Sequence, residues 1–85
     1  FHQANRFMTD FFVKKMKFDS RKVPYCLERF GNTSSASIPL TIVSELKGKL
    51  DTKTKVVLCG FGAGLSWGTS YIEFQNCNVS SLIEY

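Results

Sequence analysis

The sequence predicts an α/β protein whose elements follow the order helix, strand, helix, strand, strand, with the final two strands adjacent. Apolar residues recur at helical spacing over residues 4–17 and again over 33–49. Apolar or alternating runs typical of strands cover residues 23–28, 55–59 and 65–74. Because a βαβ unit needs a strand ahead of its helix, this order lacks its first strand.

Length and composition predict one small core. The chain has 85 residues, of which 44% are hydrophobic and 14% aromatic, and a domain of this size is marginally stable by itself. The charged fraction of 21% and the absence of low-complexity segments exclude a disordered chain. Residues 1–85 are therefore predicted to form a single segment, with a tail over 76–85.

The first helix is predicted from residue 4 to about residue 17. Lys14, Lys15 and Lys17 gather in its last turn, where cations complement the helix dipole. Its apolar stripe is predicted to pack in the core rather than on a membrane surface. The stripe consists of Ala4, Phe7, Met8, Phe11, Phe12 and Met16.

A short strand and a second helix are predicted next. Pro24 restricts the strand over 23–28 to the edge of a sheet or to a strand start, because proline has no N–H. The second helix is predicted from about Thr33 to Lys49, starting early and kinked at Pro39. The alternative is a helix whose first residue is Pro39. The predicted buried face comprises Ile42, Val43, Leu46 and Leu50.

The last part of the chain predicts two adjacent strands. Residues 55–59 form a continuous apolar run, which is typical of a strand buried on both faces. The glycines over 60–64 have GxGxG spacing, but a strand follows them where a dinucleotide-binding fingerprint needs a helix. They therefore indicate a hairpin turn, whose small residues allow a backbone amide to approach a substrate closely.

Charge and cysteine usage limit the classes of partner and cofactor. The net charge is +4, and seven of the eleven basic residues lie between Arg6 and Arg29, so this face attracts acidic partners. No nucleic-acid motif accompanies the lysines, and no apolar stretch is long enough to span a bilayer. Three cysteines without metal-ligand spacing predict no metal site and indicate a reducing, cytoplasmic location. Cys26 and Cys59 are predicted to be buried.

Two short strings carry candidate chemistry. His2-Gln3-Ala4-Asn5 opens the chain, and Gly31-Asn32 precedes the second helix. His2 and Asn32 form a candidate pair of hydrogen-bond donors to a developing negative charge. Alone, the pair is a weak signal, because a histidine near a terminus is usually exposed and an asparagine after glycine usually serves as a turn or cap. No nucleophile or base accompanies them.

Together the motifs resemble β-ketoacyl-[acyl-carrier-protein] synthase III, a thiolase-like condensing enzyme of bacterial fatty-acid synthesis. The strings HQAN, GNTSSASIP and GFGAGLSWG stand in the order and spacing of that family, over residues 1 to about 75. The resemblance implies a thiolase-like fold, of which this chain is the end of the C-terminal half. We therefore expect an inactive C-terminal fragment of a cytoplasmic, homodimeric parent enzyme.

The resemblance also implies an active site of cysteine, histidine and asparagine. The histidine matches His2 and the asparagine matches Asn32, whereas the cysteine belongs to the missing N-terminal portion. The implied reaction passes an acyl group from acyl-CoA to that cysteine, and malonyl-acyl carrier protein then loses carbon dioxide. His2 and Asn32 would donate hydrogen bonds to the resulting enolate oxygen. Both thioesters are substrates, and no cofactor is implied.

Two further roles follow from the resemblance. The backbone N–H of Ala63 matches an oxyanion-hole donor, at a position where glycine is common, so Ala63 must adopt an ordinary backbone conformation. A docking surface for the acyl carrier protein is implied at Gln3, Ala4, Asn5, Arg6, Phe7, Lys14 and Lys15. Two alternatives stay open: a related thiolase-fold acyltransferase with another acyl or extender substrate, and, less favoured, a basic module that binds nucleic acid or membrane.

Overall fold

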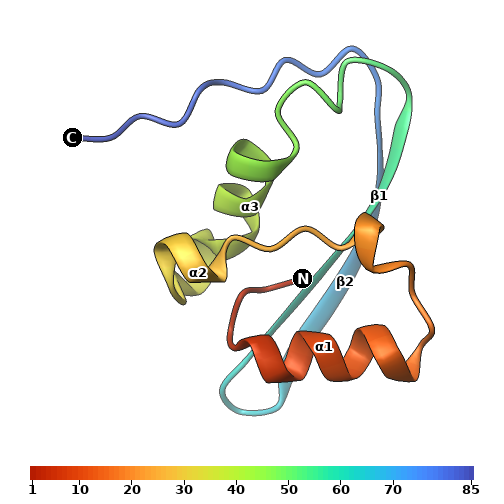
Figure 1. The fold of residues 1–85 in the computed structure, drawn as a ribbon, viewed down its shortest axis with the longest axis vertical. Coiled ribbons are helices and arrows are strands. Elements are labelled where there is room, and N and C mark those ends of the chain that lie inside the picture. Colours follow the sequence, from red (N-terminus) through yellow and green to blue (C-terminus); the bar gives the residue numbers. More distant parts are fainter.

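The computed structural model describes all 85 residues, as three α-helices, two 3-10 turns and one two-stranded sheet (Figure 1). The elements are α1 (Arg6–Lys15), the 3-10 turn Ser20–Lys22, α2 (Leu27–Phe30), the 3-10 turn Ser34–Ala36, α3 (Ser37–Glu45), β1 (Thr54–Gly62) and β2 (Ser66–Phe74). The α/β class and the adjacency of the last two strands are confirmed.

Helix α1 starts two residues later than predicted because Asn5 caps it, and it ends at Lys15 rather than near residue 17. The Asn5 side chain accepts a hydrogen bond from the N–H of Met8 at 2.8 Å, which satisfies one of the unpaired donors of the first turn. The predicted apolar stripe is only partly covered, since Phe7 is 80% exposed and Phe11 54% exposed. Thr9 is the one buried residue of the helix.

The strand predicted over residues 23–28 is wrong. Residues 24–26 are irregular, and α2 starts at Leu27. A strand needs a neighbouring strand to take up its backbone groups, and the N–H of Cys26 instead donates to the side-chain oxygen of Gln3 at 3.1 Å. Gly31, with a φ of +68°, ends α2 in a conformation that favours glycine.

Helix α3 starts at Ser37, directly after the 3-10 turn. Pro39 is the third residue of α3, and the first few N–H groups of a helix have no acceptor within it. The N–H that proline lacks is therefore not needed, and neither a kink nor a start at Pro39 is required. The buried residues are Ser37 and Thr41 rather than the predicted Ile42, Val43 and Leu46, which are half-buried. Leu50, beyond the helix, is fully buried as predicted.

Strands β1 and β2 form an antiparallel hairpin, as predicted, with Gly62 paired to Ser66 beside the turn and Thr54 paired to Phe74 at the far end. Gly64 has a φ of +76° in the turn of residues 63–65. Gly60 and Gly62 lie in β1 itself.

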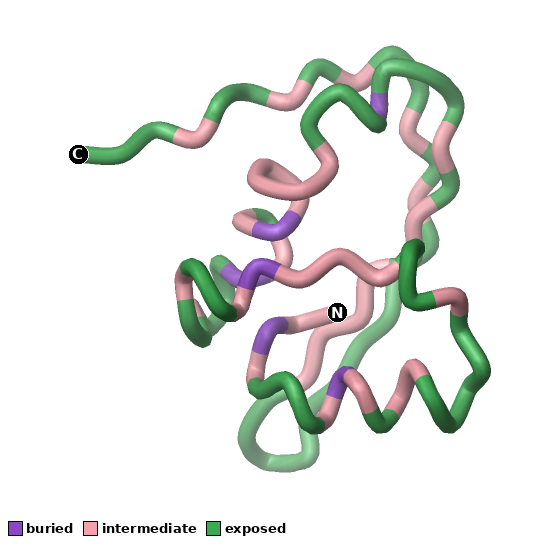
Figure 2. Tube along the Cα trace, viewed as in Figure 1, coloured by how far each residue is buried: buried purple, intermediate pink, exposed green.

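Burial of the hairpin on both faces is confined to one end of β1. On one face the ring of Phe12, from α1, lies 6.3 Å from the ring of Phe61. On the other face the Ile38 side chain lies 3.7 Å from where a Gly60 Cβ would stand. The rest of the run predicted to be buried contradicts the prediction, because Val57 is 60% exposed. Strand β2 is largely exposed as well, and its Trp67 is 79% exposed (Figure 2). A two-stranded sheet has too few covering elements to hide both faces.

The core is small and mostly polar. Six residues are buried, and five of them gather where the start of the chain meets α1, α2 and α3 (Figure 2). The sixth, Leu50, lies apart from them in the segment that joins α3 to β1. Cys26 is buried as predicted, whereas Cys59 is only half-buried. The buried residues are Gln3, Thr9, Cys26, Ser37, Thr41 and Leu50.

Residues 75–85 contain no helix or strand and pass back beside the loop that follows α3 (Figure 1). The N–H of Cys77 donates to the carbonyl of Leu50 at 3.0 Å, which fixes the start of this tail. Among the helices, none has the combination of length and hydropathy that crossing a bilayer takes.

Leu50 and Leu65 allow one substitution to be compared at two exposures. Leu50 is 0% exposed and Leu65 is 95% exposed. Leu50→Ala should lower the free energy of unfolding by roughly 2–5 kcal/mol, because it removes buried methyl groups and leaves a cavity. Leu65→Ala, the matched control, should change it by less than about 0.5 kcal/mol. Urea unfolding followed by circular dichroism measures both, and equal losses would contradict the assigned core.

Candidate functional site

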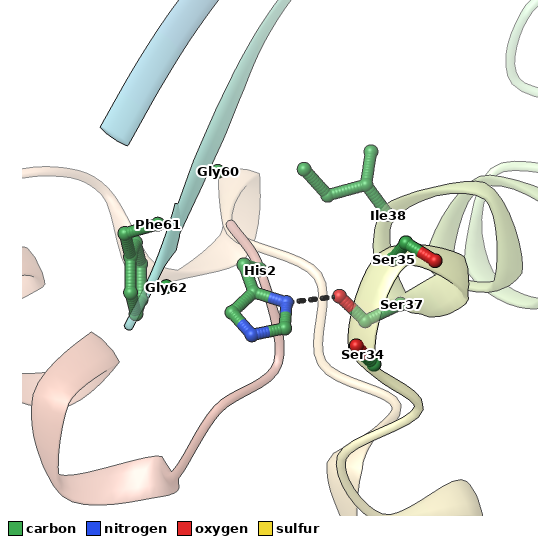
Figure 3. Close-up of a pocket in the computed structure, with 8 residues that line it drawn as sticks. All are labelled: His2, Ser34, Ser35, Ser37, Ile38, Gly60, Phe61 and Gly62. Carbon is green, nitrogen blue, oxygen red and sulfur yellow. Dashed lines mark hydrogen bonds between the residues drawn. The ribbon is translucent and has the colours of Figure 1, made fainter. Parts of the chain in front are cut away.

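Three segments that are distant in sequence surround a cavity of about 280 Å³ (Figure 3). His2 comes from the start of the chain, and strand β1 contributes its last three residues. The segment that opens α3 supplies three serine hydroxyls. The lining residues are His2, Ser34, Ser35, Ser37, Ile38, Gly60, Phe61 and Gly62.

His2 is held from three sides. Its backbone N–H donates to the carbonyl of Cys59 at 2.8 Å, which ties the start of the chain to the edge of β1. The imidazole meets the ring of Phe61 edge-on, with centroids 5.3 Å apart. Its Nδ1 is hydrogen-bonded to the hydroxyl of Ser37 (Figure 3). Nε2 has no partner within the chain and is the atom available to a ligand.

Asn32 lies beside the cavity rather than in its lining. Its side-chain oxygen accepts a hydrogen bond from the N–H of Ser34 at 2.9 Å, and Ser34 lines the cavity. Because the oxygen is engaged in this turn, the orientation of the amide is set and its NH₂ group has no partner within the chain. The structure thus places one imidazole nitrogen in the cavity, and one amide NH₂ group two positions before Ser34 in the chain.

Ala63 follows Gly62 in the hairpin turn, next to the cavity but outside its lining. It is not among the residues with positive φ, so its backbone has the ordinary conformation that its expected role requires. Its N–H makes no backbone hydrogen bond.

The buried amide of Gln3 was missed by the sequence analysis. Gln3 is 2% exposed, and its NH₂ donates to the carbonyl of Phe1 at 2.9 Å, while its oxygen accepts from the N–H of Cys26 at 3.1 Å. A side chain in this position cannot meet a partner, so the structure removes Gln3 from the predicted docking surface. The amide instead anchors the segment that carries His2.

Cys26, whose N–H is bonded to Gln3, also connects this region to α3 through Thr41. The Thr41 hydroxyl donates to the carbonyl of Ser37 at 2.7 Å, which uses its only hydrogen. The thiol of Cys26 must therefore donate to the Thr41 oxygen, 3.1 Å away. Spacing was the signal that could have found this network, since Ser37 and Thr41 are four residues apart and share one face of a helix.

The remaining predicted docking residues differ in how free their charges are. The Arg6 guanidinium lies 2.9 Å from Glu28 and 3.3 Å from Asp10, so two carboxylates offset its charge. Lys14 and Lys15 are exposed and take part in none of the ion pairs. Phe7 is exposed, Asn5 is exposed and caps α1, and Ala4 is half-buried. The unpaired positive charge of α1 is thus at its C-terminal end.

Metal-ligating side chains are scattered over the chain. No three histidine, cysteine, aspartate or glutamate side chains lie close enough together to hold a metal ion.

The chain is similar to one family of proteins over most of its length. Residues 1–74 match the family described as 3-oxoacyl-[acyl-carrier-protein (ACP)] synthase III C terminal. A β-ketoacyl-[acyl-carrier-protein] synthase III of Lactococcus lactis subsp. lactis is 45% identical over 75 residues, which are 85% of this chain and 23% of the relative. The enzyme of that name from Rhodopirellula baltica is 46% identical over 74 residues, 86% of this chain and 21% of the relative.

A solved structure shares the fold. The crystal structure of 3-oxoacyl-(acyl-carrier protein) synthase from Burkholderia xenovorans LB400 superposes with a TM-score of 0.92 at 39% sequence identity. The match covers 99% of this chain and 24% of that chain. The described chain therefore spans about a quarter of the length of the proteins it matches.

Tyr25 is predicted to ionise late. Burial is the main cause that raises its pKa, followed by its hydrogen bond to Asp10 at 2.9 Å and the charge of that carboxylate, while Arg6 opposes them. Because the pKa of a free tyrosine is about 10, the unfolded chain ionises first, and stability should fall as pH rises from that value through the folded pKa. In an absorbance titration, one phenol should ionise at a higher pH than a free tyrosine. Tyr25→Phe should remove this late transition, whereas Tyr71→Phe, the control, should leave it in place. A late phenol that survives Tyr25→Phe would contradict this.

Proposed function

The chain belongs to the family of 3-oxoacyl-[acyl-carrier-protein] synthase III C-terminal regions, and on that premise we propose that it supplies the decarboxylating half of a condensing active site. The whole enzyme would join an acyl group from acyl-CoA to malonyl-acyl carrier protein. Because the chain spans about 23% of its relatives, the cysteine nucleophile is assigned to the remainder of such an enzyme. None of Cys26, Cys59 and Cys77 lines the cavity.

The observation that carries the proposal is the state of His2. Its backbone N–H and its Nδ1 are both engaged by the protein, so only Nε2 is left for a substrate. The cavity around it is lined by serine hydroxyls and strand backbone, without a carboxylate. An oxygen that gains negative charge would therefore find donors and no repelling group.

The chemistry needs such donors at one step. When the malonyl thioester loses carbon dioxide, the carbon–carbon bond to the carboxylate breaks and its electron pair moves onto the thioester as an enolate. The enolate carbon then attacks the acyl thioester on the cysteine, a carbon–carbon bond forms, and the thiolate leaves. Hydrogen bonds from His2 and Asn32 to the enolate oxygen would stabilise the charged intermediate, and losing one such donor typically costs roughly 3–4 kcal/mol.

Asn32 and Ala63 take separate roles in this proposal. The NH₂ group of Asn32 donates at any pH and carries no charge, which suits an enolate. Its oxygen is already bonded to the N–H of Ser34 at 2.9 Å, which orients the amide. The Ala63 N–H is assigned to the oxyanion of the acyl-enzyme, and its free state supports that role.

The C-terminal end of α1 is the proposed docking surface for the acidic carrier protein. Lys14 and Lys15 are exposed and unpaired, so their charge is available to acidic side chains of a partner. Arg6 is a weaker candidate, because Glu28 and Asp10 already contact it.

The open face of the hairpin suits a chain that is one part of a larger enzyme. Val57 is 60% exposed and Tyr71 62% exposed, and we assign the covering of such side chains to the rest of the enzyme. A dimeric state of that enzyme and a cytoplasmic location stay predictions.

Asn32→Ala tests the enolate assignment in the intact enzyme that carries this chain. Decarboxylation of malonyl-acyl carrier protein should fall by roughly 10²–10³-fold, because one donor to the enolate is lost. Transfer of the acyl group from acyl-CoA to the cysteine, followed by mass spectrometry, should persist. Asn78→Ala, an exposed tail residue, is the control. Condensation at the normal rate in Asn32→Ala would rule out the assignment.

Reversing the charge of Lys14 and Lys15 tests docking. Lys14→Glu/Lys15→Glu should raise the KM for malonyl-acyl carrier protein about tenfold, a change of roughly 1.4 kcal/mol. The KM for acyl-CoA should stay unchanged. The matched control is Lys49→Glu/Lys55→Glu, which reverses one exposed lysine in the loop after α3 and another on β1. Added salt should narrow the difference between the two variants, and an equal effect of both would refute the assigned surface.

A further inference from the structure

We propose that Ser37 is a positioning residue for His2, because its hydroxyl donates to Nδ1 and so keeps the imidazole proton on Nε2. The catalytic consequence of this assignment rests on the proposed function. The direction of the hydrogen bond itself rests only on the contacts around Ser37.

The direction follows from the hydrogens available. A serine hydroxyl donates one hydrogen bond and accepts up to two. The N–H of Gln3 already donates to the Ser37 oxygen at 3.3 Å. The only other partner of that oxygen is Nδ1 of His2, and Ser37 is 1% exposed. If Nδ1 carried the proton, the hydroxyl hydrogen of Ser37 would be buried without an acceptor, which is costly.

Neighbouring hydrogen bonds fix the position of the Ser37 hydroxyl. The carbonyl of Ser37 accepts from the Thr41 hydroxyl at 2.7 Å, which fixes the first turn of α3 beside the cavity. The Gln3 N–H is fixed in turn, because the Gln3 side chain is bonded to the backbone of Phe1 and Cys26. Ser37 therefore meets His2 from a preorganised position.

The tautomer decides whether His2 attracts or repels the enolate. With the proton on Nε2, the ring presents an N–H to the cavity, where no protein group competes for it (Figure 3). With the proton on Nδ1, the ring would present a lone pair to a negatively charged oxygen. The contact of Phe61 with the ring, at 5.3 Å between centroids, fixes its plane but does not choose between the nitrogens.

Nitrogen NMR of the ¹⁵N-histidine-labelled intact protein tests the hydrogen bond without any assay of activity. The His2 signals are identified by their loss in His2→Asn. We expect a protonated Nε2, an unprotonated Nδ1 and a slowly exchanging Ser37 hydroxyl proton with a cross-peak to Nδ1. In Ser37→Ala the second tautomer should become populated, whereas Ser35→Ala, which changes another serine of the same cavity, should leave the spectrum unchanged.

The wild-type spectrum decides by itself if Ser37→Ala does not fold, since a proton on Nδ1 would overturn the assignment. A Ser37→Ala spectrum identical to the wild type would overturn it as well.

Kinetics then separate this inference from the proposed function. Ser37→Ala should lower kcat for malonyl decarboxylation about tenfold with little change in KM, and Ser37→Thr, which keeps the hydroxyl, should restore the rate and the single tautomer. If the tautomer changes as expected but the wild-type enzyme does not decarboxylate malonyl thioesters, the proposed function fails and the role of Ser37 stands. A full wild-type rate in Ser37→Ala would refute the catalytic consequence.

Discussion

The buried amide of Gln3 is the contact on which the arrangement of the site depends. It joins the backbone of Phe1 to that of Cys26 through hydrogen bonds of 2.9 and 3.1 Å. A buried amide without partners would be strongly destabilising, so these two bonds are effectively obligatory once Gln3 is inside. They set the path of the first residues of the chain, and His2 is carried on that path to the edge of β1.

The core around Gln3 is specific rather than large. Four of its six buried residues are polar, and apolar burial alone would hold them in many arrangements. Directional bonds among Gln3, Ser37 and Thr41 select one of them, since each donor has a single acceptor at hydrogen-bond distance. Beside this network, Nδ1 of His2 is bonded to Ser37, and Nε2 is the ring nitrogen without a partner in the chain. The residues that order the core therefore also determine which nitrogen of His2 is available to a ligand.

The surface divides into a charged part and an apolar part. On α1 the charge of Arg6 is offset by carboxylates, whereas Lys14 and Lys15 are unpaired, so the attraction for an acidic partner is concentrated at one end of the helix. The hairpin exposes Trp67 and Tyr71 on its open face. Few elements of the chain pack against the hairpin, and this explains why the predicted two-sided burial of β1 is realised only near Gly60 and Phe61.

Elements governed by local rules could be predicted from the sequence. The hairpin follows from the alternation of apolar and polar residues and from a glycine-rich turn. Helix α1 follows from apolar periodicity that ends at a group of lysines, although Asn5 makes it start two residues later than predicted. The strand expected over residues 23–28 could not be judged locally, because a strand exists only if a neighbour accepts its backbone bonds. The motifs identify His2 and Asn32 as candidate donors, but they do not show which residues surround them.

The contact between His2 and Ser37 spans 35 positions of the chain, and no local pattern encodes it. The sequence by itself determined which donors are present. The tertiary structure decided which of their atoms are engaged and which is free, because only folding brings Gln3, Ser37 and β1 together around the imidazole.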